Sequence, residues 1–237
     1  MFTLFFVAPE ELVNDTIELT GAQAHHAISV LRVQKDEILR IADGQGNWVE
    51  GPITNLRKDA LVIDVRRRGA DINPKVEIAV AQALLKGDNQ KSAIDQLVQA
   101  GVSRIMPWHA QRSVGTVDKS EKWLESIVSA ARQSRRSQLP ELEPVTDLKS
   151  LIESCSRYDL VIALHEGATK KLSDLLPLSH LRKVLLIVGP EGGMSNEEIE
   201  LIKGADLEPV QMGETVIRAD LAGALALAAL NALTGTW

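Results

Sequence analysis

After Pro74 the chain alternates continuous apolar runs with segments of helical spacing, and this alternation constrains the fold more than any other feature. The runs at residues 160–164 and 184–188 contain no charged side chain, as expected for parallel strands that are covered on both faces. Strands that alternate with helices build a domain around a mostly parallel sheet. The sequence therefore predicts an α/β fold for this part of the chain.

The individual elements follow from the same reading. Strands are predicted at residues 76–85, 104–108, 160–164, 184–188 and 209–212. Helices are predicted at residues 89–100, 119–137, 195–203 and 218–233, and Gly101 stands where a glycine commonly ends a helix.

The first 68 residues have a different pattern, that of a small β-rich domain. Short strands are predicted at residues 12–19, 37–42, 48–53 and 60–65, and one helix at residues 21–31 with Thr20 as its N-cap. Strands of this length and spacing suggest a small barrel. Residues 66–74 are polar, contain Gly and Pro, and are predicted to be a linker. We expect two domains, at residues 1–72 and 73–237.

The composition of the chain excludes a collagen, a disordered tail and a membrane-spanning bundle. Apolar residues make up 45% of the chain and charged residues 24%, which is typical of a soluble globular protein. The net charge is −6 and only residues 74–150 hold more basic than acidic side chains, so any RNA binding must use local patches. The single cysteine, Cys155, excludes an internal disulfide framework and fits a cytoplasmic location. We expect no metal site and no membrane segment, since the apolar run 219–233 is shorter than a membrane helix needs.

The most informative segment, residues 184–198, reads VLLIVGPEGGMSNEE. A buried strand is followed by Gly189-Pro190-Glu191-Gly192-Gly193, and Ser195 with Glu198 then forms a capping box that starts a helix. Glycines allow backbone amides to approach a ligand closely, and ligands of α/β sheets bind beyond the carboxyl ends of the strands. The segment therefore predicts a ligand-binding loop. It does not fit the Walker phosphate pattern, because Met194 follows Gly193.

Two further strands end in polar loops. His165 and Glu166 follow one strand, and they are either an acid–base pair or loop residues with local hydrogen bonds. Arg218 stands at the start of an Ala- and Gly-rich helix, as a salt-bridged cap or as a catalytic cation. Basic clusters around Lys86, Arg112 and residues 132–136 suit phosphate oxygens as well as they suit a solvated surface.

Taken together, these segments resemble the ribosomal RNA small subunit methyltransferase E family of the SPOUT class. The residues that carry the resemblance stand in family order over nearly the whole chain. They are Phe5-Phe6-Val7, His25-His26, Val30-Leu31-Arg32, Lys86-Gly87-Asp88, Arg112-Ser113, Gln133-Ser134-Arg135, Gly189-Pro190-Glu191-Gly192-Gly193, Met212-Gly213 and Ile217-Arg218.

The resemblance implies a PUA-like RNA-binding barrel at residues 1–72 and a knotted, dimerising methyltransferase domain at residues 73–237. It further implies S-adenosylmethionine as methyl donor, a homodimer, and methylation of N3 of a specific uridine in 16S ribosomal RNA. Knotted chains are rare among folded proteins, and the SPOUT class is among the exceptions. We expect the assembled small subunit as substrate, because a net charge of −6 gives only weak general attraction to RNA.

The resemblance also assigns the residues of the site. Cofactor binding is expected from three loops, at Leu164, His165 and Glu166, at Val188, Gly189, Pro190, Glu191, Gly192 and Gly193, and at Met212, Gly213, Val216, Ile217 and Arg218. RNA contacts are expected at Arg32, Lys86, Arg112, Arg135 and Arg136. The sequence departs from the family pattern at Leu4, where the family often has a basic residue, and at residues 219–222, where no base is assigned.

The chemistry of uracil suggests roles for two residues. N3 must lose its proton before it attacks a methyl carbon, and a cation near O2 or O4 stabilises the imidate that forms. Arg218 is the candidate for that cation, and Glu191 either orients a group, accepts a proton or structures its loop.

Three alternatives remain open. A ribose 2′-O-methyltransferase of the same class would place the methyl group on the sugar. A non-catalytic RNA-binding assembly factor would keep its cellular function after Arg218→Ala. An unrelated α/β enzyme with a nucleotide cofactor would give no calorimetric signal with S-adenosylmethionine.

Overall fold

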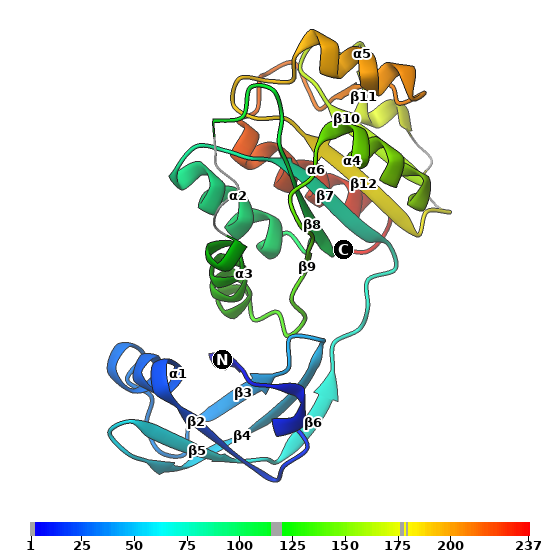
Figure 1. Cartoon of the computed structure of the whole chain (residues 1–237). Coiled ribbons are helices and arrows are strands. Elements are labelled where there is room, and N and C mark those ends of the chain that lie inside the picture. Colours follow the sequence, from blue (N-terminus) through cyan, green and yellow to red (C-terminus); the bar gives the residue numbers. More distant parts are fainter. Residues whose placement is uncertain (1–2, 115–119, 176–177, 179) are drawn as a thin grey trace. The chain divides into compact units, whose positions relative to one another are not determined.

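The computed structural model describes residues 3–114, 120–175, 178 and 180–237. Contacts within the chain separate two compact units (Figure 1). The first combines Met1–Asn73 with Ala131–Leu139, and the second combines Pro74–Ala130 with Pro140–Trp237. The domain division expected between residues 72 and 73 stays a prediction.

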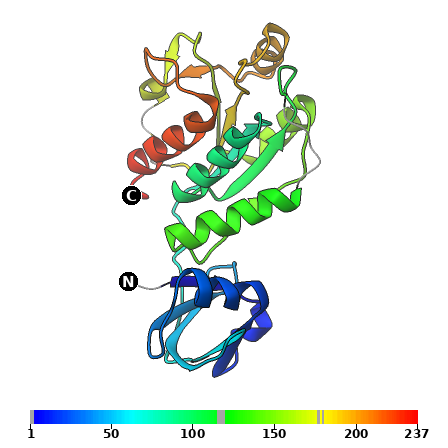
Figure 2. The same ribbon diagram turned by 90° about the vertical axis from the view of Figure 1, so that its left-hand side faces the viewer.

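The first unit contains a curled six-stranded sheet (Figure 2). Its strands are β1 (Thr3–Phe6), β2 (Thr16–Thr20), β3 (Ile38–Ala42), β4 (Asn47–Leu56), β5 (Ala60–Asp64) and β6 (Arg67–Ala70). The order is β1-β3-β4-β5-β2, with β6 paired to β4. Alternate residues such as Ile17 and Leu19 of β2 point inward and are almost fully buried, which gives this unit its own core.

Three sequence predictions for this unit need correction. Part of the expected linker is strand β6, because it pairs with β4 through the backbone and needs no apolar side chains to do so. The expected strand 12–19 begins only at Thr16, because the 3-10 turn Pro9–Glu11 is continued by further turns, in which the Asn14 amide donates to the Glu11 carbonyl at 3.3 Å. The expected helix 21–31 is a short α1 (Gly21–His25) continued by a π-helical turn, His26–Val30, and the Thr20 side chain does not cap it.

The second unit is built on a seven-stranded sheet in which every pairing is parallel. Its strands are β7 (Glu77–Ala83), β8 (Arg104–Trp108), β9 (Glu141–Leu142), β10 (Leu160–Leu164), β11 (Lys170–Lys171), β12 (Lys183–Val188) and β13 (Val210–Gln211). The order is β11-β13-β10-β12-β7-β8-β9. The predicted parallel α/β fold is confirmed, with the uncharged stretches of β10 and β12 adjacent near the centre of the sheet.

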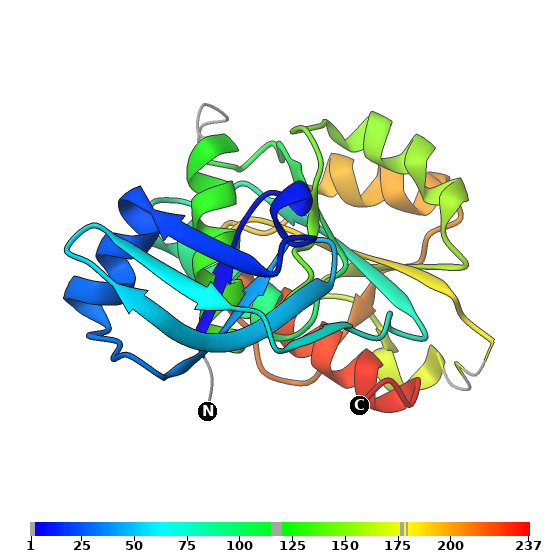
Figure 3. The same ribbon diagram turned by 90° about the horizontal axis from the view of Figure 1, so that it is seen from below.

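Helices cover both faces of this sheet (Figure 3). The helices are α2 (Asp88–Gln99), α3 (Ser120–Ser134), α4 (Leu148–Ser154), α5 (Asn196–Gly204) and α6 (Ala219–Leu233), with 3-10 turns at Cys155–Arg157 and Leu172–Leu175. Leu151 of α4 and Ile202 of α5 share a core with one face of β7 and β12. On the other face, α6 packs against α2, β7 and β12.

Gly223 explains how α6 approaches the sheet so closely. A Cβ atom at this position would lie 3.1 Å from Leu97 of α2 and 3.4 Å from both Val188 and Val80. The 3.1 Å distance is tighter than ordinary packing and the two 3.4 Å distances lie at its near limit, so a side chain here would require Leu97 or α6 to shift. Arg218, which directly precedes α6, is thereby held near the carboxyl end of β12.

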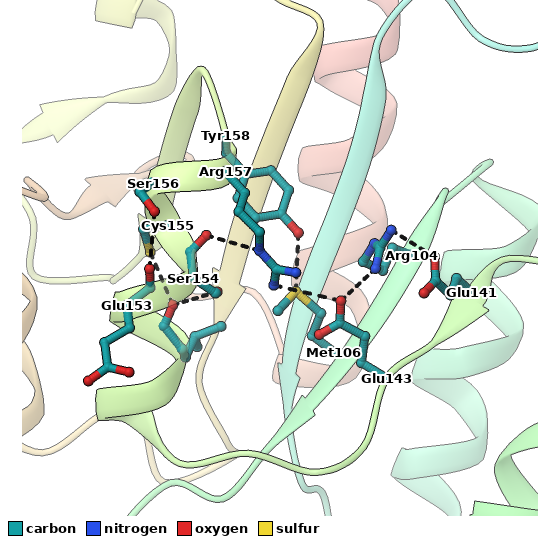
Figure 4. A network of polar contacts seen from close by, with 11 residues as sticks. Arg104, Met106, Glu141, Glu143, Glu153, Ser154, Cys155, Ser156, Arg157 and Tyr158 are labelled. Carbon is teal, nitrogen blue, oxygen red and sulfur yellow. Dashed lines mark hydrogen bonds and ion pairs between the residues drawn. The ribbon is translucent and has the colours of Figure 1, made fainter.

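An ion-pair network lies at the opposite, amino end of β8 (Figure 4). Arg104 pairs with Glu141 at 2.7 Å and with Glu143 at 2.6 Å, and Arg157 approaches Glu143 at 3.7 Å. Burial acts to lower the pKa of Arg104, but the hydrogen bond and charge of Glu143 and the charge of Glu141 raise it above its usual value. The network ties Glu143 and Arg157, which lie on either side of α4, to Arg104 of β8.

The sequence missed the shortest elements of the second unit. Helix α4 spans seven residues and strands β9 and β11 two each, which is too little for periodicity to show. The signal that could have found α4 is its N-cap, where the Asp147 carboxylate accepts a hydrogen bond from the Ser150 amide at 2.8 Å. The trefoil knot stays a prediction.

Candidate functional site

The loops that follow β10, β12 and β13 leave the sheet at one edge. Because every pairing is parallel, Leu164, Val188 and Gln211 end their strands on the same side. Strands β10, β12 and β7 are consecutive neighbours in the sheet, so the loops after them are neighbours too. This edge is where α/β sheets bind ligands.

Two of the three expected cofactor loops line one cavity. Its walls come from the loop after β10, the loop after β13 and the first turns of α6. The lining residues are Leu164, His165, Glu166, Val210, Gln211, Met212, Gly213, Thr215, Ile217 and Ala222. The cavity has a volume of about 60 Å³. Ligand pockets usually measure roughly 300–1,000 Å³, so this cavity alone would enclose only one part of a nucleoside-sized ligand.

The third expected loop, residues 189–193, follows β12 and is called the GPEGG loop here. Gly193 has a φ of +67°, which favours glycine, and a Cβ atom there would lie 3.6 Å from the Glu166 carboxylate. The GPEGG loop therefore adjoins the first of the two cavity loops. Val188 itself is buried, and its carbonyl accepts a hydrogen bond from the Trp108 indole at 3.0 Å.

The GPEGG loop is held by hydrogen bonds within itself, by one from Arg112 and by the capping box that follows it. The Gly193 amide donates to the Pro190 carbonyl at 2.9 Å, and Arg112 Nη1 donates to the Gly192 carbonyl at 2.8 Å. The predicted capping box is confirmed: the Ser195 hydroxyl accepts from the Glu198 amide and the Glu198 carboxylate accepts from the Ser195 amide. A loop held at so many points presents its backbone in one conformation.

Glu191 joins the GPEGG loop to the turn before α2. Its Oε1 atom accepts hydrogen bonds from the Lys86 amide at 3.0 Å and from Asn89 Nδ2 at 2.8 Å. Partial burial acts to raise the pKa of Glu191, but the bonds from Asn89 and from the backbone lower it below its usual value. A carboxylate with a lowered pKa is a weak proton acceptor. Of the roles expected for Glu191, these contacts favour structuring of the loop.

Arg218 lies at the N-cap of α6 with its guanidinium held on two sides. Its Nε and Nη2 atoms donate to Asp220 at 3.1 and 3.2 Å, and Nη2 also donates to Asn89 Oδ1 at 3.2 Å. Its side chain is 73% exposed, whereas that of Asp220 is 9% exposed. Among the described residues, Nη1 has no partner. Both readings of Arg218 from the sequence fit this geometry, since it is a salt-bridged cap that still offers a cation to a ligand.

The loop before Arg218 presents unused backbone donors. Residues 213–216 are exposed, and the amides of residues 213–217 form no hydrogen bond within the described part of the chain. Backbone amides that lack an internal partner are satisfied by water or by a ligand. The cavity thus offers apolar contact from Leu164 and Ile217 and an acceptor in the Glu166 carboxylate, and these amides add donors for the polar groups of a ligand.

The expected RNA contacts fall in both units. In the second unit Lys86 and Arg112 are exposed beside the GPEGG loop. In the first unit Arg32 is exposed and has a φ of +55°, whereas Arg135 and Arg136 are half-buried. Burial lowers the pKa of Arg136 to about 10, although Asp71 acts to raise it. Contact of these side chains with RNA stays a prediction.

The two departures from the family pattern have structural counterparts. Leu4 is 1% exposed in β1, so its side chain packs in the core and offers nothing to RNA. Asp220 is the buried partner of Arg218, and its Oδ2 atom also accepts from the Ser92 hydroxyl at 3.1 Å.

Sequence reasoning missed the residues that hold Arg218, namely Asn89, Ser92 and Asp220. Asp220 gave a signal, as a lone carboxylate in an apolar helix. Asn89 gave none, because only the fold brings it between Glu191 and Arg218.

A larger cavity, of about 660 Å³, lies between α2 and α3. Its floor is apolar, with Leu85, Ile94 and Trp123, and its rim carries both signs of charge. Lys91 and Lys122 are balanced there by Asp88 and Glu125. Charge alone therefore does not favour an RNA backbone in this cavity.

The described residues hold neither a metal-binding cluster nor a membrane-spanning helix. Across residues 3–114, 120–175, 178 and 180–237, no group of three or more His, Cys, Asp or Glu side chains is placed to hold a metal ion. Over the same ranges, no helix has both the length and the apolar character needed to cross a membrane.

Family models match both parts of the chain. An RNA methyltransferase domain matches residues 72–231, and an RNA methyltransferase PUA domain matches residues 19–66. The expected PUA-like N-terminal domain is thereby confirmed.

Relatives match almost end to end. The chain is 32% identical to the ribosomal RNA small subunit methyltransferase E of Mycobacterium bovis, over 99% of this chain and 93% of the relative. It is 26% identical to the protein of the same name from Bacillus subtilis, over 91% and 90% of the two chains.

Solved structures share the fold. A methyltransferase from Legionella pneumophila with bound S-adenosylmethionine is 27% identical, covers 98% of both chains and superposes with a TM-score of 0.87. The ribosomal RNA small subunit methyltransferase E of Neisseria gonorrhoeae, bound to the same cofactor, is 24% identical over 98% of both chains with a TM-score of 0.88. The expected SPOUT-type α/β fold is confirmed by this likeness.

Proposed function

Because the chain belongs to the ribosomal RNA small subunit methyltransferase E family, we propose that it transfers a methyl group from S-adenosylmethionine to N3 of a specific uridine in 16S ribosomal RNA. The observation that carries the proposal is the arrangement of Arg218. A guanidinium with one free nitrogen stands at the carboxyl edge of a parallel sheet, next to the loops that follow β10, β12 and β13.

The cofactor would be held by the loops at this edge. Leu164 and Ile217 offer apolar contact to a base, Glu166 accepts from hydroxyl or ammonium groups, and the amides of residues 213–217 offer donors. S-adenosylmethionine supplies, when bound, a methyl group activated by a positively charged sulfur. Since the cavity is small, we expect the loop at residues 212–218 to close over the ligand.

Arg218 would act on the uracil. Loss of the N3 proton places negative charge on O2 and O4, and a guanidinium donor aimed at one of these oxygens lowers the energy of that anion. The free Nη1 atom is the donor available for this contact. Asp220 and Asn89 fix the other two nitrogens, so little reorganisation is needed when the base arrives.

Glu191 would serve this chemistry through its loop. Its carboxylate already accepts two hydrogen bonds and its pKa is lowered, which favours a role in holding the loop over that of proton acceptor.

RNA would be held by basic side chains of both units. Lys86 and Arg112 flank the GPEGG loop, and Arg32, Arg135 and Arg136 belong to the PUA-like unit. Guanidinium groups suit phosphate oxygens and fix orientation more than sequence.

We also propose a homodimer, supported by the outer side of α6. Leu221 and Leu225 stand one helical turn apart and are 38% and 41% exposed. Exposed apolar side chains in a row on one helix favour contact with another protein surface. The knot, the cytoplasmic location and the assembled small subunit as substrate remain part of this proposal.

The direct test is chemical analysis of the product. Small ribosomal subunits and, separately, protein-free 16S RNA are incubated with the purified protein and S-adenosylmethionine labelled in its methyl group, and the RNA is then extracted and digested to nucleosides. We expect the label in N3-methyluridine. Label in a 2′-O-methylated nucleoside would instead support the ribose methyltransferase, and no label with any RNA would support a non-catalytic assembly factor.

A further inference from the structure

Asn89 lies between two charged groups from distant parts of the chain. Its Nδ2 atom donates to Glu191 Oε1 at 2.8 Å, and its Oδ1 atom accepts from Arg218 Nη2 at 3.2 Å. An amide turned the other way would set its oxygen against the carboxylate and its N–H groups against the guanidinium. The two neighbours therefore fix the amide in one orientation.

Each neighbour is also held by a second support. The Lys86 amide donates to the same oxygen of Glu191 at 3.0 Å. On the other side, Asp220 accepts two bonds from Arg218. Asn89 thus connects two groups that are already anchored, and it is the link between them.

Helix α2 supplies one support of Arg218 and holds the other. Asn89 contacts the guanidinium directly, whereas Ser92, three residues further along, donates to Asp220 Oδ2 at 3.1 Å. Ser92 in turn accepts from Gln96 Nε2 at 2.7 Å. Residues spaced by three and four lie on one side of a helix. One face of α2 therefore contacts both Arg218 and its partner Asp220.

We propose that Asn89 is a positioning residue that couples the orientation of Arg218 to the GPEGG loop through Glu191. This inference rests on the proposed function, because it concerns how the arginine meets the uracil. When the GPEGG loop is in place, Glu191 holds the Asn89 amide with its oxygen toward Arg218. If the loop moves away, the amide is released and Arg218 loses one of its two supports.

The test uses three variants and one control in the full-length protein. Asn89→Ala removes both bonds. Asn89→Asp keeps an acceptor for Arg218 but places a carboxylate against Glu191. The double variant Asn89→Asp with Glu191→Gln removes the repulsion between the two carboxylates, because the glutamine is neutral and its amide can donate to the new aspartate once it turns away from the Lys86 amide. Gln99→Ala removes an exposed amide from the same helix and serves as the control.

For each variant, kcat, the KM for RNA and the dissociation constant of S-adenosylmethionine are measured, together with the melting temperature. We expect kcat to fall about tenfold to a hundredfold in Asn89→Ala and Asn89→Asp, with the KM for RNA within about threefold of the wild type, as for misplacement of a catalytic group. The double variant is expected to recover at least tenfold over Asn89→Asp, and Gln99→Ala to match the wild type.

Two results would overturn the inference while the wild type still makes N3-methyluridine. One is a kcat for Asn89→Ala within twofold of the wild type. The other is a double variant no more active than Asn89→Asp although it melts at the wild-type temperature. If the wild type makes no N3-methyluridine at all, the proposed function fails instead.

Discussion

Arg218 combines two properties that suit a catalytic cation. It is tied by hydrogen bonds to a buried carboxylate and to an amide, yet 73% of its side chain is exposed. An arginine that only caps a helix does not need to expose its guanidinium to a ligand. A surface arginine without hydrogen-bond partners has no fixed orientation. The combination suits a cation that must meet a substrate in a fixed position.

Replacement of Arg218 tests this reading. We expect Arg218→Ala to lower kcat by about a hundredfold or more, because one donor to a developing oxyanion is worth roughly that factor. Arg218→Lys keeps the charge but loses the fork that grips both Asp220 and Asn89, so it should recover only part of the activity. Steady-state methylation assays give the values. Arg218→Ala with an unchanged kcat would show that Arg218 is only a cap.

For Glu191 we predict a small effect of substitution on kcat, in contrast to Arg218. Since it acts as a hydrogen-bond acceptor with a lowered pKa, Glu191→Gln should keep kcat within about tenfold of the wild type, as a glutamine oxygen still accepts from Lys86 and Asn89. A loss of more than a thousandfold in the methylation assay would identify Glu191 as the proton acceptor.

The same pKa shift predicts a pH dependence of stability. A carboxyl group whose pKa is lower in the folded state stabilises the fold above its ordinary range, and this contribution is lost as the pH falls through the lowered value. Denaturation of the wild type and Glu191→Gln should therefore show a more stable wild type at pH 7, and the two should converge in acid. A gap that grows as the pH falls would contradict the assigned shift.

Among the elements, the segment between β13 and α6 is the one expected to change with the cofactor. The amides of residues 213–217 have no internal partner in the described part of the chain, so they should exchange with solvent quickly in the free protein. Hydrogen exchange measured with and without S-adenosylmethionine should show protection concentrated here. Equal exchange in both states would mean that this loop does not bind the cofactor.

The sequence was most informative where an element is long and its pattern regular. The uncharged stretches of β10 and β12, the capping box of Ser195 and Glu198, and the length of α2 follow from local physics, and the structure confirms them. Strand β6 was not predicted, because its residues are polar and only backbone pairing with β4 holds them in the sheet. The two-residue strands β9 and β11 were missed because two residues are too few to show a pattern, whereas β13, of the same length, was predicted within residues 209–212.

The candidate site also has a part that the local sequence predicts and a part that it does not. The GPEGG loop was visible from its glycines and from the strand before it. The contact of Asn89 with Glu191 joins residues 102 positions apart, and that with Arg218 spans 129 positions. No local pattern encodes such a pair, because it depends on β7 and β12 being neighbours in the sheet.

At the scale of the whole molecule, the net charge of −6 bears on the substrate. A protein with this charge is weakly repelled by RNA at long range, so binding must depend on local basic side chains and on shape. We expect purified small subunits to be methylated at least tenfold faster than protein-free 16S RNA in the same buffer. Equal rates in a side-by-side time course would show that the protein needs only the RNA.

The central claim is that this molecule modifies one base position in ribosomal RNA. Its most direct test is to map methylated bases in 16S RNA from cells that contain the protein, lack it, or carry Arg218→Ala. The account predicts one uridine methylated at N3 in the first cells and unmodified in the other two. An identical methylation map in all three would contradict it.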